Sequence, residues 1–596
     1  MTPEQVLKDN FGFTKFRNGQ EAVISRVMAG KNVLAVMPTG GGKSLCYQIP
    51  ALVNSGVTIV VSPLISLMKD QVDALKQNGI AAAAINSTIP QEAVNPILRQ
   101  AYKGKVKLIY VTPERLNMEY FRYQLNFLPV DLIAIDEAHC ISQWGHDFRP
   151  AYRQLRSAIA GLRSQPNTLA LTATATPAVR EDIGHQLGID PANFVITSFT
   201  RPNITFRVIH PENSTRRYIR EYLTAHRDEA GIIYVNTRKE VDELTAYLLE
   251  HHFPVAAYHA GMDPADRARV QDDFQFDRVN TIVATSAFGM GIDKSNVRFV
   301  LHATSAQNIE SYYQEAGRAG RDGLPSEAVL IYHPNDLRQY RWFIDQSTAD
   351  DDYRDRQYQK LQAVANYAST PECLQQYIVR YFGQDCPPCV HCSNCTDERT
   401  VQDITAESQA VLKLVQELHG RFGKGVVAQA ATGSHNQRMQ EIGAPSLANF
   451  GALQKLTKQA AASLIDYLVA IGVLKTAGAQ YPVIQVGKRG WAVLEGEQTV
   501  TRRQKKSPDR SRTQVEESPD VAALFDRLRE KRRKLAADQG VPPFMVFSDR
   551  TLHDMARLKP QTRRDFLEVN GVGQQKLARY GETMMRVIGD YLAGEN

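Results

Sequence analysis

The chain has 596 residues and a formal net charge of +6, from 70 basic and 64 acidic residues, and this balance permits a polyanionic partner without identifying one. The length is several times that of a typical domain, so roughly three to five domains are expected. No apolar stretch is long enough to span a bilayer and the opening "MTPEQVLKDN" lacks signal-peptide features, which excludes a membrane or secreted protein and favours a soluble intracellular one.

From residue 30 to residue 340, short β-branched apolar runs alternate with longer helical patterns. The runs include "VLAVM", "VTIVVS" and "LIAID", and later "GIIYVN", "NTIVAT" and "AVLIYH". This alternation is typical of parallel βαβ sheets. The stretch "SFTRPNITFRV" near 198–208 divides the runs into two blocks, each the size of one doubly wound domain. The sequence therefore predicts two α/β lobes with a cleft between them.

The loop "MPTGGGKS", residues 37–44, follows the first apolar run. In such a loop, glycines let backbone N–H groups close around phosphates, Lys43 reaches the β and γ oxygens, and Ser44 binds magnesium. The pattern GxxxxGK[ST] fails at its first position, Met37, and the alternative is a glycine-rich turn that only links a strand to a helix. We favour an ATP site, with predicted contacts from Thr39, Gly40, Gly41, Gly42, Lys43 and Ser44.

The second half of an ATP site is an acid at the end of a strand, and Asp136 after "LIAI" fits this description. Asp136 would hold magnesium together with Ser44, while Glu137 would orient and deprotonate the attacking water. An acidic pair that caps a strand is usually only a solvated strand end. The presence of a phosphate loop in the same block favours the catalytic interpretation.

Five of the seven cysteines are clustered, which favours a metal site over disulfides in a reducing compartment. Cys389, Cys392 and Cys395 have the spacing of metal ligands. Cys386 extends this spacing upstream, so either Cys373 or Cys386 could supply the fourth thiolate, and an iron–sulfur cluster is an alternative to zinc.

The remaining segments differ in composition. Residues 341–370 are rich in charge with helical spacing, and residues 401–500 are typical of helices followed by a short hairpin. The stretch "TRRQKKSPDRSRTQVEESPD" has the Ser, Pro and charge bias of a solvated linker, and a last helical domain fills 519–596.

Eight motifs together resemble, in order and spacing, the series of superfamily 2 helicases of the RecQ family. They are "FGFTKFRNGQ", "MPTGGGKS", "VVSPLISLMKDQ", "VTPERL", "DEAHCISQWGHDFRP", "LTATAT", "ATSAFGMGIDK" and "QEAGRAGRDG". The DEAH tetrapeptide alone would equally indicate a DEAH-box RNA helicase. The aromatic loop after the acids, the cysteine cluster and the C-terminal segments resemble the RecQ pattern instead.

The resemblance implies roles for residues outside the phosphate loop. Phe13, Arg17 and Gln20 would recognise adenine, the ring by stacking and Gln20 by paired hydrogen bonds to its edge, whereas an amphipathic helix entry is the alternative. Three second-lobe residues would complete catalysis, with the last as the finger that neutralises charge on the γ-phosphate: Gln314, Arg318 and Arg321. A solvated helix face or a salt-bridge partner is the alternative for the two arginines.

The stretch after the acids combines aromatic and basic residues. If ATP is hydrolysed only to move along nucleic acid, the acid that orients water should sense a bound strand, and a loop attached directly to it is the simplest sensor. Trp144 and Phe148 would stack on unpaired bases, while His146 and Arg149 would reach phosphate or the opposite lobe. The alternative is that Trp144 and Phe148 are core residues beneath a loop.

The resemblance also implies a fold and its boundaries. Zinc would be held by Cys373, Cys389, Cys392 and Cys395, and we favour Cys373 because its separation lets zinc pin a helix pair to a loop. A winged helix would bind duplex DNA, with a short hairpin around Tyr481. The expected divisions are a RecA-like ATP-binding lobe (1–203), a second RecA-like lobe (204–340), a helical zinc-binding subdomain (341–400), a winged-helix RQC domain (401–500), a linker (501–518) and an all-α HRDC domain (519–596).

Together these features predict an ATP- and magnesium-dependent DNA helicase of the RecQ type that moves 3′-to-5′ on single-stranded DNA and acts in recombination, repair and replication restart. A DEAH-box-like RNA helicase and an ATP-gated nucleic-acid clamp without unwinding are the alternatives. Expected partners are single-stranded and duplex DNA, forks and junctions, with single-strand-binding protein and recombination proteins as further candidates. We expect a cytoplasmic, nucleoid-associated monomer.

Overall fold

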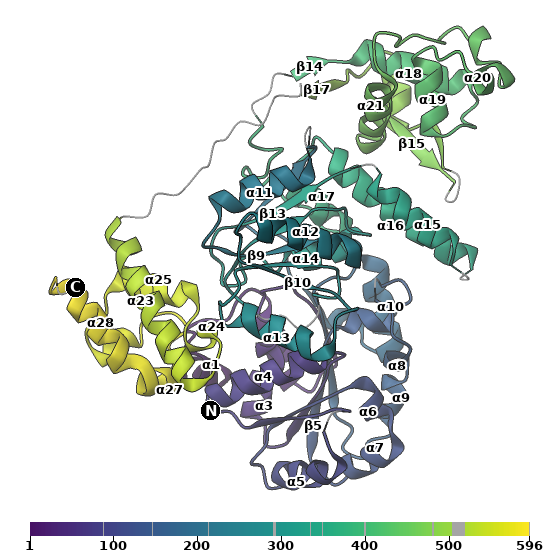
Figure 1. The fold of residues 1–596 in the computed structure, drawn as a ribbon. Coiled ribbons are helices and arrows are strands. Elements are labelled where there is room, and N and C mark those ends of the chain that lie inside the picture. The colour runs from purple at the N-terminus through teal and green to yellow at the C-terminus, as the bar shows by residue number, and fades with distance from the viewer. Residues whose placement is uncertain are drawn as a thin grey trace.

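The architecture consists of two stacked α/β lobes flanked by smaller domains, as the computed structural model shows in Figure 1. The N-terminal lobe lies below the second lobe, a two-stranded and helical domain lies above, and the C-terminal helices lie to one side. No helix in the described part of the chain is long and apolar enough to cross a membrane. The structure describes residues 1–87, 89–145, 147–211, 214–289, 294–333, 335–347, 350–397, 401–478, 482–503 and 519–594.

Lobe 1 is built on a parallel sheet with the strand order β3-β4-β2-β5-β6-β1-β7. Its strands are short runs rich in Val, Ile, Leu and Ala that are mostly buried, as expected for a sheet covered by helices on both faces. The strands are β1 (Val33–Val36), β2 (Val57–Val61), β3 (Ala82–Ile85), β4 (Leu108–Val111), β5 (Val130–Ile135), β6 (Asn167–Thr172) and β7 (Phe194–Ile196).

Helices cover both faces of this sheet, and two apolar clusters fill the spaces between helices and strands. The described helices of lobe 1 are α1 (Pro3–Phe11), α2 (Gln20–Met28), α3 (Leu45–Val53), α4 (Ile65–Gln77), α5 (Gln91–Tyr102), α6 (Pro113–Asn117), α7 (Glu119–Leu125), η1 (Ala138–Ile141), α8 (Pro150–Arg153), α9 (Leu155–Ala160), α10 (Pro177–Leu187) and η2 (Pro191–Asn193).

Lobe 2 is a second parallel sheet, with the order β10-β11-β9-β12-β13-β8. Both sheets confirm the predicted pair of doubly wound lobes. The strands are β8 (Ile204–Ile209), β9 (Ala230–Tyr234), β10 (Val255–Tyr258), β11 (Thr281–Ala284), β12 (Val297–His302) and β13 (Ser326–Ile331). The helices are α11 (Thr215–Ala225), α12 (Arg238–Glu250), α13 (Pro264–Gln275) and α14 (Ile309–Ala316).

A helical region follows lobe 2, and we call residues 336–397 the zinc region. It contains α15 (Asp336–Asp345), α16 (Asp351–Ser369) and α17 (Leu374–Tyr381). Its buried side chains, among them Leu361, Leu374 and Phe382, belong to the same apolar cluster as the inner faces of both lobes. Helix α15 runs across the boundary expected at residue 340, because Leu337 in its first turn already packs into that shared core.

The predicted winged-helix domain has its own apolar core. It contains α18 (Thr405–Glu417), α19 (Lys424–Ala431), α20 (Gln437–Glu441), η3 (Ala444–Ser446), α21 (Lys458–Ala470), β15 (Leu474–Ala477), β16 (Val483–Val486) and α22 (Lys488–Leu494). Strand β17 (Thr501–Arg503) pairs antiparallel with β14 (Val401–Asp403), so the stretch expected as a linker from residue 501 begins with a strand. Tyr481 and residues 504–518 lie outside the described residues.

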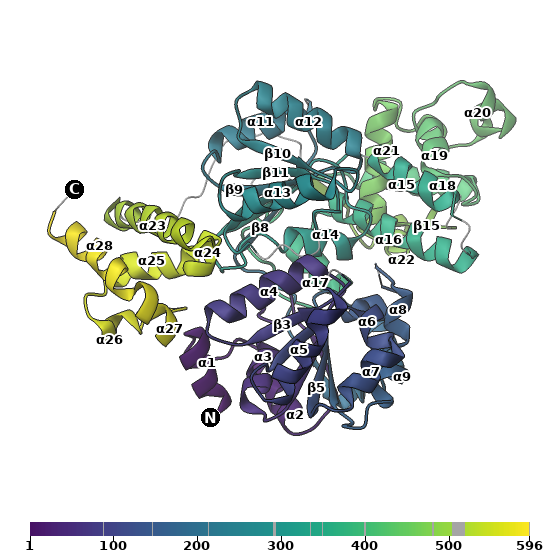
Figure 2. The same cartoon turned by 60° about the horizontal axis from the view of Figure 1, so that its bottom comes forward.

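The C-terminal domain, residues 519–594, is helical and also has its own core, which includes Leu528, Phe547 and Ile588. Figures 1 and 2 both place it beside α1 of lobe 1. Its helices are α23 (Pro519–Gln539), α24 (Pro543–Val546), α25 (Asp549–Leu558), α26 (Arg563–Phe566), α27 (Gln574–Lys576), the π-helical η4 (Leu577–Gly581) and α28 (Glu582–Leu592).

Candidate functional site

The phosphate loop joins the end of β1 to the start of α3, as its sequence predicts. Gly40 (φ +82°) and Gly42 (φ +78°) adopt left-handed conformations that residues with a Cβ rarely take. A Cβ on Gly42 would lie 2.3 Å from Nε2 of Gln20, so a side chain at this position would displace the Gln20 amide. Ser44 directly precedes α3 and makes no cap hydrogen bond to it.

The three residues predicted to recognise adenine lie together beside this loop. Phe13 is half-buried against the apolar cluster of α1 and α2. The Arg17 guanidinium donates to Gly40 O. The side chain of Gln20 donates from Nε2 to Gly42 O at 3.0 Å and accepts from the Arg17 N–H at 2.7 Å. In this state the Gln20 amide therefore contacts the phosphate loop, and its role toward adenine stays a prediction.

The acidic pair lies at the end of β5, next to the phosphate loop. Asp136 follows the last residue of β5, and its carboxylate accepts the Glu137 N–H at 3.0 Å. Glu137 has a φ of +49°, a left-handed conformation that is uncommon for a residue with a side chain and that concentrates at functional sites. Its carboxylate lies 3.2 Å from Nδ1 of His139, which is also 3.0 Å from the Thr172 hydroxyl at the end of β6.

The pKa of Lys43 is affected by its burial and by charged groups from both lobes. Burial lowers the pKa of the Lys43 ammonium, while the nearby carboxylates of Glu137 and Asp136 raise it and the Arg321 guanidinium lowers it. Burial raises the pKa of the Asp136 carboxyl, and the neighbouring Glu137 carboxylate adds to this effect. The Ser44 hydroxyl and the Asp136 carboxylate are hard oxygen donors, which suit magnesium. These two residues would hold it.

Helix α14 and the turn after it bring residues of the second lobe next to the phosphate loop. Gln314 lies on α14, and the turn that follows it, residues 317–321, carries Arg318 and Arg321, so we call it the arginine turn. A Cβ on Gly40 would lie 3.5 Å from the Cα of Arg321, which shows that the turn contacts the phosphate loop directly. The lobes are thus closed on each other at the ATP site, and Arg318 is buried there rather than solvated.

Sequence reasoning missed Arg201, a buried residue of the segment between the lobes. Its guanidinium donates to Thr39 O in the phosphate loop and to Gly317 O in the arginine turn, at 2.8 and 3.1 Å. The only signal in the sequence was an arginine within the stretch that separates the two blocks of strands. Its partners are backbone carbonyls, which no residue pattern marks.

The aromatic loop that follows the acids is exposed rather than buried. Trp144 is 48% exposed and Phe148 is 36% exposed, so the alternative that they are core residues is wrong. Arg149 lies against Asp147 at 3.2 Å and donates to Pro63 O at 3.5 Å. His146 lies outside the described residues.

Helix α16 of the zinc region holds this loop from the other side. The Arg356 guanidinium lies over the Trp144 ring, 4.6 Å from its centroid. Lys360 donates from Nζ to Trp144 O at 2.9 Å and pairs with the buried Glu310 of α14 at 3.2 Å. The loop is thus connected to the acids, to lobe 2 and to the zinc region, and sequence reasoning found neither Arg356 nor Lys360.

Four cysteine sulfurs gather in the zinc region. The Sγ atoms of Cys373, Cys389, Cys392 and Cys395 all lie within 4.8 Å of one another, and Cys386 is not among them. The sulfurs of Cys373 and Cys392 are 4.0 Å apart, close to the roughly 3.8 Å edge of a tetrahedron with zinc–sulfur bonds of about 2.3 Å. Backbone N–H groups of Cys389 and Cys392 donate to the Cys373 and Cys389 sulfurs at 3.2 Å. The donor set fits structural zinc.

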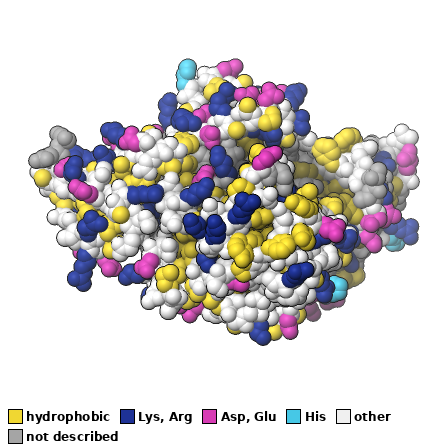
Figure 3. All heavy atoms as spheres, turned by 90° about the horizontal axis from the view of Figure 1, so that it is seen from below, with side chains coloured by type: hydrophobic (Ala, Val, Ile, Leu, Met, Phe, Trp, Pro, Cys, Tyr) yellow, Lys and Arg dark blue, Asp and Glu magenta, His cyan; other side chains and the backbone are white. Residues whose placement is uncertain are grey.

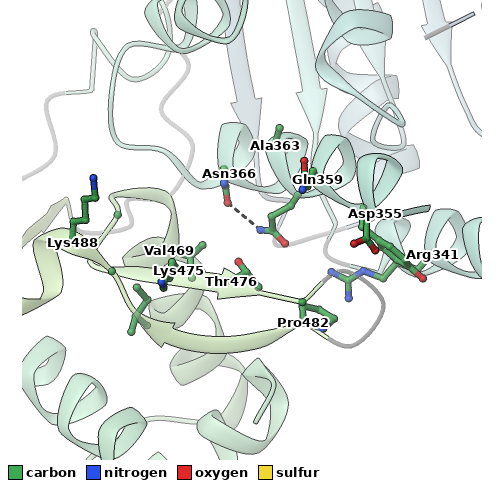
Figure 4. A pocket seen from close by; sticks show the side chains of 16 residues that line it. Arg341, Asp355, Gln359, Ala363, Asn366, Val469, Lys475, Thr476, Pro482 and Lys488 are labelled. Carbon is green, nitrogen blue, oxygen red and sulfur yellow. Dashed lines mark hydrogen bonds between the residues drawn. The ribbon is translucent and has the colours of Figure 1, made fainter. Parts of the chain in front are cut away.

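A cleft of about 640 Å³ separates α15 and α16 from the strand pair of the winged-helix domain, as Figure 4 shows. Its walls mix polar and apolar side chains, with Gln359 and Asn366 on one side and Lys475 and Thr476 on the other. The face seen from below carries basic and acidic side chains among hydrophobic ones (Figure 3).

Comparison with known families gives five matches in the expected order. They are DEAD/DEAH box helicase (residues 17–183), helicase conserved C-terminal domain (214–323), RecQ zinc-binding (334–396), RQC domain (398–511) and HRDC domain (521–588). The first of these is shared with RNA helicases, and the last three are the ones that separate the two predicted alternatives.

Three bacterial relatives match nearly the whole length of the chain. The chain is 45% identical over 590 residues to the ATP-dependent DNA helicase RecQ of Bacillus subtilis, covering 99% of this chain and 98% of that protein. It is 40% identical over 601 residues to the protein of the same name from Haemophilus influenzae, covering 99% and 96%. The Pasteurella multocida protein of that name is 38% identical over 598 residues, covering 98% and 93%.

Proposed function

This chain belongs to the RecQ family of ATP-dependent DNA helicases, and we propose that its two lobes hydrolyse ATP through the residues described above and use the aromatic loop to couple hydrolysis to DNA. The observation that carries the proposal is the contact between the phosphate loop and the arginine turn. It brings Lys43, the acidic pair and Arg321 into one charged site.

Each group in this site has a separate task. Lys43 and Arg321 neutralise charge that develops on the transferred phosphoryl group, from opposite lobes. Glu137 orients the attacking water and accepts its proton, while His139 contacts the Glu137 side chain and is itself contacted by the Thr172 hydroxyl. Ser44 and Asp136 would hold magnesium, which would supply positive charge to the phosphates. Phe13, Arg17 and Gln20 bind the adenine.

The aromatic loop connects this chemistry to a DNA strand. Trp144 and Phe148 are exposed for stacking, and only six residues separate Glu137 from Trp144 in a segment tied to α16. A strand that displaces or reorients the loop would therefore move the backbone that carries Glu137. His146 and Arg149 would contribute phosphate contacts.

The family membership supports 3′-to-5′ movement on single-stranded DNA and a role in recombination, repair and replication restart. We propose forks and junctions as substrates, single-strand-binding protein and recombination proteins as partners, and a monomer that acts in the cytoplasm with the nucleoid. Unwinding of forked, duplex and four-way substrates, each with a 3′ or a 5′ tail, tests the direction and the preferred structure.

Phosphate release with and without single-stranded DNA tests the proposed site. Lys43→Ala should lose hydrolysis because the phosphates lose their principal cation, whereas Glu137→Gln should keep nucleotide binding and lose turnover. Near-normal hydrolysis by either variant would contradict the assignment. Equal stimulation by RNA would favour an RNA helicase, and DNA binding gated by ATP without unwinding would favour a clamp.

A further inference from the structure

Arg201 lies between the lobes and contacts both halves of the ATP site. It follows β7, precedes β8 and is only 6% exposed. Its Nη1 donates to Thr39 O at 2.8 Å and to Gly317 O at 3.1 Å. Its Nη2 donates to Ala319 O at 3.0 Å and to Gly320 O at 3.3 Å. One side chain therefore bridges the phosphate loop of lobe 1 and the arginine turn of lobe 2.

These carbonyls belong to peptide units that carry the functional groups. In a trans peptide unit the C=O and the N–H point in opposite directions. The Thr39 carbonyl shares its unit with the Gly40 N–H, and the Gly317 and Gly320 carbonyls belong to the units that lead into Arg318 and Arg321. Holding the carbonyls on Arg201 therefore orients a phosphate-loop N–H away from Arg201 and orients the backbone that carries both arginines.

The phosphate loop and the arginine turn are closely packed at Gly317. A Cβ on Gly317 would lie 3.2 Å from the Thr39 Cβ and 3.3 Å from the Arg201 Nη1. Asn203 adds a second contact to the same turn, since its Nδ2 donates to Gly320 O at 2.8 Å and to Leu324 O at 3.0 Å. A change at residue 201 would thus be transmitted directly to the spacing of the turn and the loop.

The zinc region holds Arg201 in turn. The Arg201 N–H donates to Gln375 Oε1 at 3.0 Å, and Gln375 is two residues from Cys373. Gln384 contacts the residues just before Arg201, since its Oε1 accepts the Phe199 N–H at 3.2 Å. The Phe199 and Phe382 rings stack with centroids 4.4 Å apart. The segment that carries Arg201 is therefore positioned by α17 and the residues after it.

We propose that Arg201 is a positioning residue for ATP hydrolysis, which sets the phosphate loop against Arg318 and Arg321 and is itself held by the zinc region through Gln375. This inference rests on the proposed ATPase function. It concerns the hydrolysis step more than nucleotide binding, because three of the four carbonyls that the guanidinium contacts lie in the arginine turn and one lies in the phosphate loop.

Arg201→Met and Arg201→Lys test the proposal in the full-length protein, with phosphate release and the binding of a fluorescent ADP analogue as readouts. For Met we expect kcat to fall by roughly 10²-fold, with KM and analogue affinity changed less than about threefold. Arg201→Lys should recover part of kcat, because the lysine ammonium can donate to some of the four carbonyls. It lacks the planar guanidinium that contacts all four at once. Unchanged kcat in Met, or a parallel loss of affinity and melting temperature, would overturn the proposal.

A double-mutant cycle separates positioning from general damage. If Arg201 acts by positioning Arg321, the double variant Arg201→Met/Arg321→Ala should hydrolyse ATP no more slowly than Arg321→Ala alone. Multiplied losses would show that the two residues act independently and would overturn the proposal.

Substitution of Gln375 tests the same proposal without changing the Arg201 guanidinium. Gln375→Met removes the acceptor of the Arg201 N–H and should lower kcat at constant KM, whereas Gln375→Glu keeps an acceptor and should restore it. Equal kcat in Gln375→Met and wild type would contradict the link to the zinc region. Failure of the proposed function is distinguishable, since wild-type protein would then show no DNA-stimulated phosphate release.

Discussion

The zinc region and the C-terminal domain both follow the lobes in the chain, yet they join them in different ways. Buried side chains of the zinc region, such as Leu361, Leu374 and Phe382, belong to one apolar cluster that continues through the inner faces of both lobes. Gln375 and Gln384 then hydrogen bond to the segment between the lobes. The zinc region is therefore part of the structure that hydrolyses ATP.

The C-terminal domain keeps a core of its own and meets both lobes through polar and charged contacts. The Gly571 N–H donates to Gly12 O at 3.1 Å, and Arg579 donates to Gln77 Oε1 at 3.3 Å. On lobe 2, Arg550 donates to Asp322 O at 3.5 Å. Since its apolar core is separate from that of the lobes, we expect this domain to be a separable module docked at the edge of the ATP site.

The largest predicted effect comes from breaking the zinc site. Cys389→Ser removes one of the four sulfurs, and structural zinc contributes on the order of 10 kcal/mol to the folding of small zinc modules. Because this region shares its core with the lobes, we expect loss of metal, a large drop in melting temperature and loss of ATPase activity together. Elemental analysis, calorimetry and phosphate release on the same preparation check this.

Cys386→Ser is the matched control, because Cys386 lies near the cluster but outside the four gathered sulfurs. It should keep one zinc per chain and wild-type turnover. Iron in place of zinc, or loss of metal in Cys386→Ser but not in Cys373→Ser, would contradict the ligand assignment.

The same contrast explains what the sequence could predict. Lys43, Asp136 and Glu137 are marked by residue type and by their place at strand ends, so both halves of the ATP site follow from local pattern. Arg201 and Gln375 are not marked by any local pattern. Their partners are backbone atoms of segments far away in the chain, which only tertiary packing brings near. The cysteine spacing predicted a cluster and left Cys373 and Cys386 open as the fourth ligand; the family resemblance favoured Cys373, and the gathered sulfurs agree with that choice.

A second, smaller effect should appear at the aromatic loop, which the zinc region also holds. Trp144→Ala removes an exposed ring and its contact with Arg356. Basal hydrolysis and ATP binding should persist because Trp144 has no assigned contact with nucleotide. Stimulation by single-stranded DNA and unwinding should fall, while DNA affinity weakens only modestly, since one lost stack is worth roughly 1 to 3 kcal/mol at most.

Measurement of the melting temperature, the basal rate and the stimulated rate on Trp144→Ala decides the point. Phe148→Ala should behave in the same way, because Phe148 is also exposed. Full stimulation in a folded variant would show that the loop does not couple DNA to the acids.

Removal of the C-terminal domain should have a smaller effect on the lobes. A chain that ends at residue 518 loses only the docking contacts and no residue of the shared core. We expect the melting temperature of the lobes, the zinc content and the basal ATPase rate to stay close to those of the full chain. If the truncated chain lost the calorimetric unfolding transition of the lobes and the zinc region, the C-terminal domain would be required for their folding.

The smallest predicted effect concerns the docking contact alone. Gly573 has an ordinary backbone conformation, but a Cβ there would lie 3.0 Å from Asp9 O and 3.4 Å from Gly12 N. Gly573→Ala should therefore weaken docking by about 1 kcal/mol, roughly a fivefold change in equilibrium, without strain inside the domain. Gly589→Ala makes the same chemical change on α28, where nothing lies within 4 Å, and serves as the control.

Amide hydrogen exchange provides the readout, because the Gly571 N–H is protected only by its bond to Gly12 O on the other domain. In Gly573→Ala we expect faster exchange at residues 569–573, while exchange in the core helix α25 stays unchanged. Gly589→Ala should leave both regions as in wild type or slow α28 slightly, since Ala favours a helix over Gly. Faster exchange throughout the C-terminal domain in Gly573→Ala would mean that docking and folding of that domain are inseparable, which would remove the contrast with the zinc region.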